Sequence, residues 1–594
     1  MRVSSFYNSH LIETKLLLKT NKNKRNAITI LRLVTFILII LSVYYSFKSG
    51  KGYYFIFIFL VGFLTTLWYA AIYEREMIYL LTKKKFLEEE LSTKNLYADN
   101  GIDLVNSDHF YSTDIDLFGE NSIFAKLNKT CTQGGRSKLT DKILSPSDSI
   151  VEIMECQEAV KELMEMPEWC IDFIATGRVL KEDIVSKDAI KDWLCTQNIF
   201  KNPQKVRNLI IGSRIINIST LLIIILFSLP FSILVLPFIV EIILLRYNAK
   251  KINILYSSIG NKADYLKKHL SLIAKVEERK FDSKLLQRFT AILITEKTAA
   301  SIQINSLSKI CTAFDNRNNV LASLLLNIIF LWDIDCAWKI ENWKGFNKEN
   351  FDSWIDTISE FDAIVSLSMF SFNHPNFVFP EIANEDVLLD LKGVAHPLIN
   401  PEKNVANDFF VTRGNSIFLV TGANMAGKST FLRTVAVNLV LAMIGTKVCA
   451  KQFSFSPMRL ITSMRNMDSI EKNESFFLAE LNRLKLILNY INEQKETLVI
   501  IDEPLRGTNS LDKTAGSILL IKKILSLKKD TCVLLATHDI SLTEIANDYP
   551  ESIIPKYFDI EIVDDQIIFD YKIKDGIASK MNAVELMKNM LIIE

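Results

Sequence analysis

The feature that most constrains this chain is the run Thr421–Thr430, T-G-A-N-M-A-G-K-S-T, which contains a complete G-x-x-x-x-G-K-S loop. An apolar run at 416–420 precedes it and an amphipathic run at 431–444 follows it, so the loop joins a predicted strand to a predicted helix. Its glycines let backbone N–H groups turn toward phosphate oxygens, and the helix start adds a partial positive charge. The segment therefore predicts a nucleoside triphosphate site.

The residues of this loop are all candidate contacts to the nucleotide. Lys428 is expected to reach the β and γ phosphates, and Ser429 is expected to ligate Mg²⁺. Asn424 is also a candidate catalytic residue. The predicted nucleotide-binding set comprises Gly422, Ala423, Asn424, Met425, Ala426, Gly427, Lys428, Ser429 and Thr430.

Two further apolar strands are predicted downstream, each ending in polar side chains. Residues 497–503 end in Asp502 and Glu503, so the first carboxylate can join the Mg²⁺ shell and the second can orient or deprotonate the attacking water. Residues 532–538 end in His538, a candidate sensor of the γ phosphate. Either element alone would more often be a solvated strand end. Their order after the phosphate loop favours a shared catalytic site.

The composition indicates several domains and a membrane part. The 594 residues are 49% hydrophobic and include 37 Phe, and the 23% of charged residues leave a net charge of +1. This balance gives no support for a nucleic-acid partner, so any DNA contact needs a local basic patch. The eight cysteines are scattered without metal-ligand spacing, which favours reduced thiols in the cytosol.

Two apolar stretches near the N-terminus, Ala27–Phe47 and Tyr53–Tyr73, are each long enough to cross a membrane as a helix. Basic residues lie outside both ends of the pair, including Lys83–Lys85, so the positive-inside rule puts both ends in the cytoplasm. We therefore expect a transmembrane hairpin. A buried hairpin of a soluble protein is the alternative.

A second apolar stretch, Ile215–Leu245, contains one charged residue, Glu241, and is interrupted by Pro230 and Pro237. Cationic residues at both ends favour a second membrane hairpin with short, tilted arms. A single long span would instead put the two flanks on opposite sides of the membrane. A third apolar run, Val320–Trp332, is too short to span and is expected to be a core helix.

The rest of the chain is predicted to be helical up to about residue 378, and strand and helix signals alternate from Pro380 onward. This pattern predicts an α/β P-loop ATPase domain, a parallel sheet with helices on both faces, closed by a hairpin of Tyr557–Val563 and Gln566–Lys574. The expected divisions are a basic cytoplasmic N-terminus at 1–26, transmembrane hairpins at 27–75 and 207–247, a core domain at 76–206, helical levers at 248–378 and the ATPase domain at 379–594.

With these elements in order, the chain resembles the MutS family of mismatch-repair ATPases. The phosphate loop differs from the family's T-G-P-N-M-x-G-K-S-T at Ala423, and Asp502–Thr508 is similar to its D-E-x-G-R-G-T, with Leu505 in place of a glycine. Further similar segments are Gly393–Pro397, Ala536–Asp539, Gly576–Lys580 and, for the core domain, Asp116–Gly135. The resemblance implies Mg²⁺-dependent ATP hydrolysis.

Residues 468–477 resemble the family's signature loop, although Asn473 stands where the family has glycine. In the family this loop reaches the nucleotide of the partner subunit, so the resemblance implies a homodimer through the ATPase domain, with Ser475 contacting the γ phosphate in trans. A serine at a helix start can also act only as an N-cap.

The resemblance does not extend to the mismatch-reading domain, which is not expected among the residues before 76, nor to a recognisable DNA clamp. DNA binding to mismatched or branched duplexes, in repair or recombination, is therefore implied by the family alone. The favoured interpretation is a MutS-like ATPase anchored in the cytoplasmic membrane, with the ATPase facing the cytoplasm and driving the levers. The alternatives are a nucleotide-gated scaffold and an ABC-type transport ATPase, although the L-S-G-G-Q loop of the latter is absent from the sequence.

Overall fold

The computed structural model describes residues 3–92, 99–106, 108–179, 187–259, 262–294, 298–414, 416–423, 425–464, 476–493, 496–506, 508–527, 530–563 and 566–577. The chain forms two compact units. The first unit comprises Met1–Leu91, Thr130–Lys138 and Glu168–Ala363, and the second comprises Ser92–Lys129, Leu139–Pro167 and Ile364–Glu594. Each unit thus gathers segments from both the expected core domain and the expected lever region.

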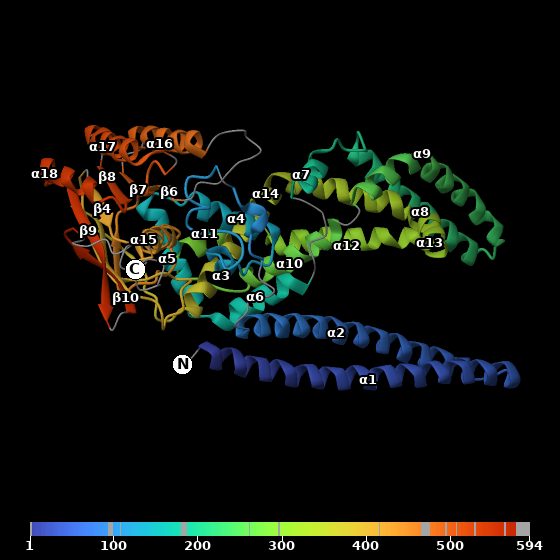
Figure 1. Cartoon of the computed structure of the whole chain (residues 1–594). Helices are drawn as coiled ribbons and strands as arrows, with labels where there is room; N and C mark the ends of the chain where they lie inside the picture. Colours follow the sequence, from blue (N-terminus) through green and yellow to red (C-terminus); the bar gives the residue numbers. More distant parts are fainter. Residues whose placement is uncertain are drawn as a thin grey trace. The chain divides into compact units, whose positions relative to one another are not determined.

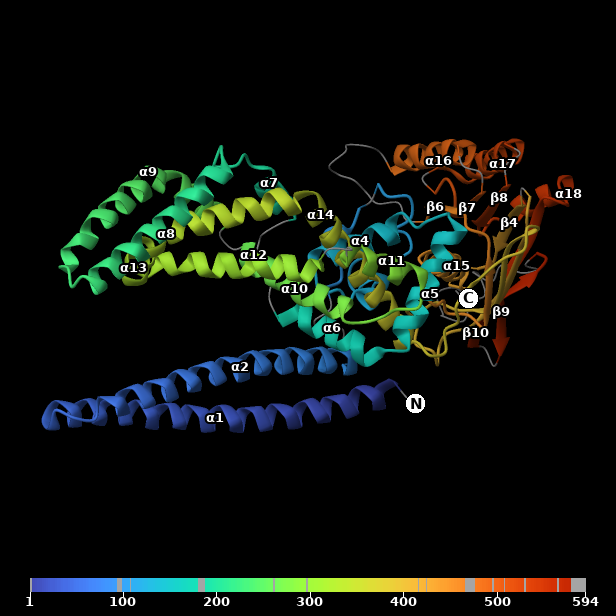
Figure 2. The ribbon, with the colours of Figure 1, turned by 180° about the vertical axis from the view of Figure 1, so that it is seen from behind.

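The first unit begins with two long helices, α1 (Val3–Ser49) and α2 (Tyr53–Leu91), which lie side by side in both ribbon views (Figures 1 and 2). The basic N-terminal residues belong to α1 rather than to a separate segment. Small polar side chains such as Ser42 and Ser46 are buried, whereas apolar side chains such as Phe47 and Phe57 are exposed. This distribution is the reverse of that of a water-soluble helix pair.

A second apolar hairpin is formed by α8 (Pro203–Leu226), the 3₁₀ turn η2 (Phe231–Leu234) and α9 (Val235–Ile259). Within the described residues, four helices are long and apolar enough to cross a membrane: α1, α2, α8 and η2 with α9. In each of them, no more than 17% of the most apolar window is buried. Their length and composition agree with the two hairpins expected from the sequence.

Aromatic side chains join two of the remaining helices of the first unit, α6 (Pro167–Val179) and α14 (Trp332–Asn373). The rings of Trp169 and Phe173 lie 5.5 Å apart, and Phe361 lies 5.6 Å from Phe173. The helices are α6, α7 (Lys187–Cys195), α10 (Lys262–Glu277), α11 (Lys284–Leu293), α12 (Ala300–Phe314), η3 (Asp315–Asn318), α13 (Val320–Phe330) and α14, the last extending past residue 363. The helical character of this region therefore agrees with the sequence pattern.

The expectation that the third apolar run forms a core helix is wrong. In α13 the apolar side chains of Val320, Leu321, Leu324 and Leu325 are exposed, and the one buried residue is Asn327. The sequence pattern shows how apolar the helix is, but does not show which of its faces the neighbouring helices cover.

The second unit contains two sheets. The smaller one has the order β1-β5-β2-β3, and the larger one has the order β10-β9-β4-β8-β7-β6. The strands are β1 (Glu381–Ile382), β2 (Val387–Val394), β3 (Asn407–Thr412), β4 (Ser416–Thr421), β5 (Gln452–Phe455), β6 (Arg459–Ser463), β7 (Glu496–Asp502), β8 (Asp530–Ala536), β9 (Ile553–Val563) and β10 (Gln566–Asp575). The helices of this unit are η1 (Ile102–Leu104), α3 (Ile123–Leu127), α5 (Ile150–Met164), α15 (Lys428–Met443), α16 (Phe476–Glu493), α17 (Ser510–Ser526), η5 (Ile540–Glu544) and α18 (Ile545–Asp548), while α4 (Gln133–Leu144) joins the two units.

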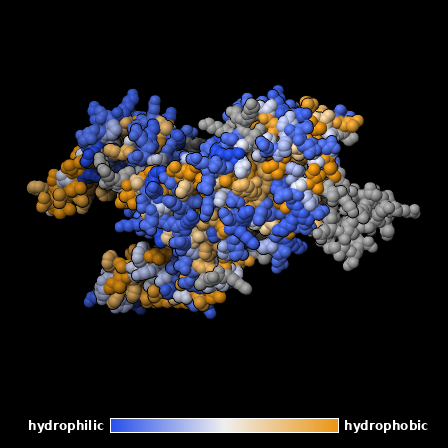
Figure 3. Space-filling view, turned by 90° about the vertical axis from the view of Figure 1, so that its left-hand side faces the viewer, coloured by the Kyte–Doolittle hydropathy of each residue, from blue (hydrophilic) through white to orange (hydrophobic). Residues whose placement is uncertain are grey.

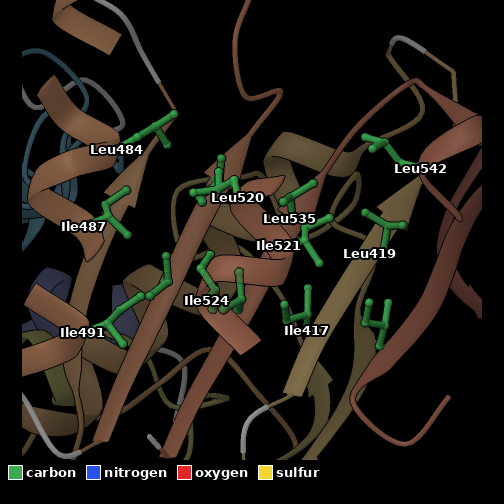
Figure 4. Close-up of a cluster of buried hydrophobic side chains, with 14 of the residues drawn as sticks. Ile417, Leu419, Leu484, Ile487, Ile491, Leu520, Ile521, Ile524, Leu535 and Leu542 are labelled. Carbon is green, nitrogen blue, oxygen red and sulfur yellow. The ribbon is translucent and has the colours of Figure 1, made fainter. Parts of the chain in front are cut away.

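The larger sheet confirms the predicted α/β class. Strands β9, β4, β8, β7 and β6 are parallel, and β10 closes the edge as the antiparallel partner of β9. One face packs on α16 and α17 through residues such as Ile487, Ile521 and Leu535 (Figure 4). On the other face the ring of Phe431 in α15 lies against Phe409, which in turn contacts Phe418 of β4. Both faces are therefore covered, and this explains the nearly continuous apolar sequence of the central strands.

The space-filling view in Figure 3 shows one face of the molecule. Hydrophilic residues predominate over the middle of this view, and hydrophobic residues gather in groups toward its edges. The exposed hydrophobic residues are thus concentrated rather than evenly spread.

Candidate nucleotide site

The candidate site lies where three parallel strands end. Strand β8 lies between β4 and β7, and Ala536 pairs with Val420 on one side and with Asp502 on the other. The phosphate loop, the carboxylate pair and the histidine therefore leave the same edge of the sheet. Chain connections diverge on either side of β4, and this is the position at which parallel α/β sheets bind ligands.

The phosphate loop follows β4 in a conformation that requires glycine. Gly422 has φ 142° and Gly427 has φ 106°, and a Cβ on Gly422 would lie 2.8 Å from the carbonyl oxygen of Phe558. Lys428 begins α15, and its Nζ donates to the carbonyl oxygens of Gly422 at 2.6 Å and Ala423 at 2.9 Å. The lysine side chain thus folds back over the loop and fixes the loop backbone at Gly422 and Ala423.

Lys428 is buried, with 5% of its surface exposed, and burial lowers the pKa of its ammonium group, although Glu503 and Asp502 partly offset that effect. Its hydrogen-bond partners among the described residues are two neutral carbonyl groups. A buried ammonium group with neutral partners favours an anionic ligand. The position therefore suits a phosphate group.

A hydroxyl and a carboxylate meet at the predicted Mg²⁺ position. Ser429 Oγ donates to Asp502 Oδ2 at 2.6 Å, and Asp502 is buried with 8% of its surface exposed. Arg506 Nη2 donates to the main-chain oxygen of Asp502 at 2.8 Å. Oxygen ligands of this kind suit Mg²⁺, which usually takes one or two protein oxygens and completes its shell with phosphate and water. Ser429 and Asp502 therefore fit the metal.

Glu503 is fixed just beyond the end of β7. Its φ is 54°, and its backbone N–H donates to Ala536 O at 2.9 Å. His538 Nδ1 lies 3.2 Å from Glu503 Oε1, within ion-pair range but without the alignment of a hydrogen bond. Burial raises the pKa of Glu503 most strongly among the single effects, but His538, Arg506 and Lys513 together bring it below its ordinary value. The carboxylate is thus ionised and able to accept a proton.

The sequence analysis missed Glu480, a residue of α16 that supports the loop after Glu503. Its carboxylate is 3% exposed and accepts hydrogen bonds from the backbone N–H of Leu505 at 2.6 Å and of Arg506 at 3.3 Å. Leu505 has φ 62°, a left-handed conformation that is costly for a branched side chain. The one available signal was an acidic residue in the otherwise apolar first turns of the helix after the signature-like loop.

A cavity of about 470 Å³ adjoins the start of α15, and of its lining the sequence analysis predicted Gly427 and Thr430 as nucleotide contacts. The lining includes Val394, Asn404, Gly427, Phe431 and Tyr571. Apolar and aromatic walls with a few amides suit a planar base. Because Gly427 and Thr430 belong to the phosphate loop and also line this cavity, a nucleotide could extend from the loop into it.

Most of the predicted contacts of the loop can be located. Ala423, Met425 and Ala426 form its turn, with Met425 at φ 69° and 81% exposed, and Thr430 lies in the first turn of α15. Asn424 and Ser475 lie outside the described residues. The structure therefore brings together Lys428, Ser429, Asp502, Glu503 and His538, and the roles assigned to them remain predictions.

The comparisons with known proteins match the part of the chain that contains this site. The family model for MutS domain V matches residues 418–592. MutS protein homolog 4 of Homo sapiens is 32% identical over 237 residues, which are 38% of this chain and 24% of the relative. The DNA mismatch repair protein MutS of Thermotoga maritima is 30% identical over 241 residues, 39% of this chain and 29% of that protein. The DNA mismatch repair protein MSH4 of Arabidopsis thaliana is 34% identical over 184 residues, 30% of this chain and 23% of that protein.

These alignments span about a quarter of the length of the curated relatives, so they concern the domain rather than the whole of each relative. The matched range contains the phosphate loop, the carboxylate pair and the histidine that meet at one edge of the larger sheet. The chain therefore contains a domain that matches MutS domain V over residues 418–592.

Proposed function

We propose that this protein is a membrane-anchored, Mg²⁺-dependent ATPase of MutS type. The observation that supports this most directly is the convergence of Lys428, the Ser429–Asp502 pair and Glu503 at one sheet edge. Lys428 and the loop N–H groups bind the phosphates, Ser429 and Asp502 hold the metal, and the cavity beside α15 takes the base. Bound Mg²⁺ supplies charge neutralisation at the phosphates.

The hydrolytic step in this proposal depends on Glu503. Its carboxylate is ionised, so it orients a water molecule and accepts its proton as the water attacks the γ phosphate. His538, 3.2 Å from that carboxylate, restrains it and reports the state of the γ phosphate to the end of β8. Glu480 and Arg506 hold the loop on which Glu503 lies.

Two copies of the chain would share the site. We propose a homodimer through the ATPase domain, in which the segment before α16 of one subunit supplies Ser475 to the nucleotide of the other. Because Glu480 of α16 bonds to the loop after Glu503, a movement of α16 would shift this loop and with it the Glu503 carboxylate. This contact couples α16 to the site, and movement of the helical levers on ATP turnover is part of the proposal.

Two hairpins would anchor the protein. The mean hydropathy of the most apolar windows is 2.4 for α1, 2.2 for α2, 2.2 for α8 and 1.8 for η2 with α9. Basic flanks on both hairpins support a cytoplasmic ATPase at the cytoplasmic membrane. The names of the relatives support a role in DNA mismatch repair or recombination, with contact to mismatched or branched DNA as part of the proposal.

The test is to separate ATP binding from ATP hydrolysis in the purified full chain. Glu503→Gln keeps Lys428 and the metal-binding oxygens, so ATP should still bind while turnover falls by roughly 10²-fold, the scale of losing a positioned base. Lys428→Ala should weaken ATP binding itself. Wild-type turnover in both variants would show that the proposed site is not the ATPase.

A further inference from the structure

Helix α13 has its polar residue inside and its apolar residues outside. Asn327 is 6% exposed, whereas Val320, Leu321 and Leu325 are 80%, 74% and 61% exposed. The two neighbouring helices show the same inversion, with Asn217 of α8 and Glu241 of α9 buried at 7% and 2%. In water such surfaces would be costly, whereas in hydrocarbon the apolar side chains face a matching solvent.

Buried polar contacts tie these three helices together. Asn217 Nδ2 lies 2.5 Å from Glu241 Oε1 and donates to the carbonyl oxygen of Ile329 at 3.1 Å, and Ser213 Oγ also donates to Glu241. One amide thus connects α8 both to α9 and to the end of α13. Ionisable and amide side chains in apolar helices pair in this way when water is absent.

The C-terminal end of α13 has its carbonyl groups satisfied by neighbours. Besides the bond to Ile329 O, Arg214 Nη2 lies 3.3 Å from Phe330 O, and Asn327 Oδ1 accepts from the N–H of Asp333 at 2.9 Å. The chain then bends by 78° into α14. A broken helix is tolerated in hydrocarbon only where side chains satisfy the freed backbone groups, and the contacts at this break do so.

Charged residues flank the α13 segment on both sides, and side chains from the two flanks contact each other. Trp332 Nε1 donates to Ala313 O at 2.8 Å, and Arg317 lies 3.5 Å from Asp333. Arg214 of α8 pairs with Asp335 at 2.8 Å on the same side. The chain therefore leaves a charged boundary at η3 and returns to it after α13.

The lengths agree with one shared boundary. At ~1.5 Å per residue, α13 is roughly 16 Å long, too short to cross ~30 Å of hydrocarbon. The part of α8 beyond Arg214 is roughly 18 Å long by the same rise. A membrane segment of this length would therefore enter the hydrocarbon without crossing it, and both of its flanks would stay on the side of the charged residues.

We propose that α13 is a re-entrant membrane segment, inserted beside α8 and α9 with its exposed apolar face in contact with lipid acyl chains. This inference rests on the proposed membrane anchoring by the α8–α9 hairpin. It assigns the run 320–330 to the membrane part of the chain, and it makes Asn217 and Glu241 the residues that hold the segment against the hairpin.

Spin labels on single introduced cysteines test the proposal in full-length protein reconstituted into phosphatidylcholine vesicles, with the exposed Cys195 replaced by serine. The three sites are Leu325 in α13, Leu236 in α9 and, as a matched apolar control in α12, Ile302, which at 61% is as exposed as Leu325. The accessibility of each label to oxygen, which partitions into lipid, is compared with its accessibility to a water-soluble nickel chelate.

We expect high oxygen and low nickel accessibility at 325 and 236, and the opposite at 302. Lipid exposure at 236 with a water-exposed label at 325 would overturn the re-entrant segment and leave the membrane anchoring intact. Water exposure at both sites would overturn the anchoring and the segment together. Low accessibility of the label at 325 to both reagents would mean that protein, such as a second copy, covers this face, and would also overturn the proposal.

The contribution of the polar contacts is tested by adding Asn217→Leu to the protein labelled at 325. Removing the amide leaves the carbonyl oxygen of Ile329 without the donor supplied by Asn217, so nickel accessibility at 325 should rise several-fold while that at 236 stays unchanged. Thr220→Leu on the same helix is the matched control, because Thr220 is half-buried and its hydroxyl donates to the carbonyl oxygen of Ile216 in the same helix. No change with Asn217→Leu would rule out the proposed role of this residue.

Discussion

The carboxylate of Glu480 accepts a hydrogen bond of 2.6 Å from the backbone N–H of Leu505, which connects α16 to the loop that carries Glu503. The bond is buried, and the residue that it restrains is in a left-handed conformation. In the proposed mechanism Glu480 is thus a positioning residue, acting on the Glu503 carboxylate through the backbone.

Glu480→Ala should therefore lower the rate of ATP hydrolysis while leaving ATP affinity nearly unchanged. Leaving the buried N–H of Leu505 without its acceptor costs about 1–3 kcal/mol, enough to let the loop leave its position. Turnover should fall by roughly 10-fold or more, measured as phosphate release at saturating ATP. Glu493→Ala, at the exposed end of the same helix, is the control. Equal turnover in the two variants would remove Glu480 from the mechanism.

A shared site predicts complementation between two inactive variants. Ser475→Ala and Lys428→Ala should each be defective alone, because one lacks the hydroxyl supplied in trans and the other lacks the phosphate-binding ammonium. Mixing them should restore part of the activity, since some mixed dimers then contain one complete site. The measurement is ATPase rate against mixing ratio in detergent. If subunits exchange and no ratio gives rescue, Ser475 acts only as a helix cap.

Because His396 is buried, we expect the folded protein to lose stability toward unfolding in acid. Burial, assisted by Arg433, lowers its pKa from 6.5 to about 4. Between these values the unfolded chain binds a proton that the folded chain does not, so stability falls as the pH drops below 6.5. At pH 5 the loss amounts to roughly 2 kcal/mol. The thermal midpoint of the wild type should fall more steeply between pH 7 and 5 than that of His396→Gln, and parallel curves would contradict this prediction.

The topology predicts which thiols react from outside intact cells. Lys51→Cys, in the turn between α1 and α2, should react with a membrane-impermeant maleimide, because the turn is exposed and lies at the far end of the hairpin. The native Cys195 is exposed on the structure but should react only after permeabilisation. Labelling of Cys195 in intact wild-type cells would contradict the proposed orientation in the membrane.

The sequence by itself identified the parts of the site that are contiguous along the chain. The glycines at 422 and 427 mark a loop with positive φ, and the apolar runs before Asp502 and before His538 mark buried strands. These signals are local, because backbone conformation and strand burial depend on the residue itself and its near neighbours. The length and apolar character of three further runs likewise identified the long apolar helices α1, α2 and the α8–α9 hairpin.

Only the tertiary structure decided what lies next to these parts. The insertion of β8 between β4 and β7 brings Asp502 and Val420 to the level of Ala536, and no pattern along the chain encodes this strand order. The pairing of Glu480 with the loop after Glu503 likewise depends on how α16 lies on the sheet. For α13, the shortness of the apolar run favoured a core helix, whereas the structure packs Asn217 against its end and leaves the apolar face exposed. The physical reason is that the hydrophobic effect is non-directional. An apolar sequence therefore does not specify its partner, and the packing of distant elements decides which face of a helix is covered.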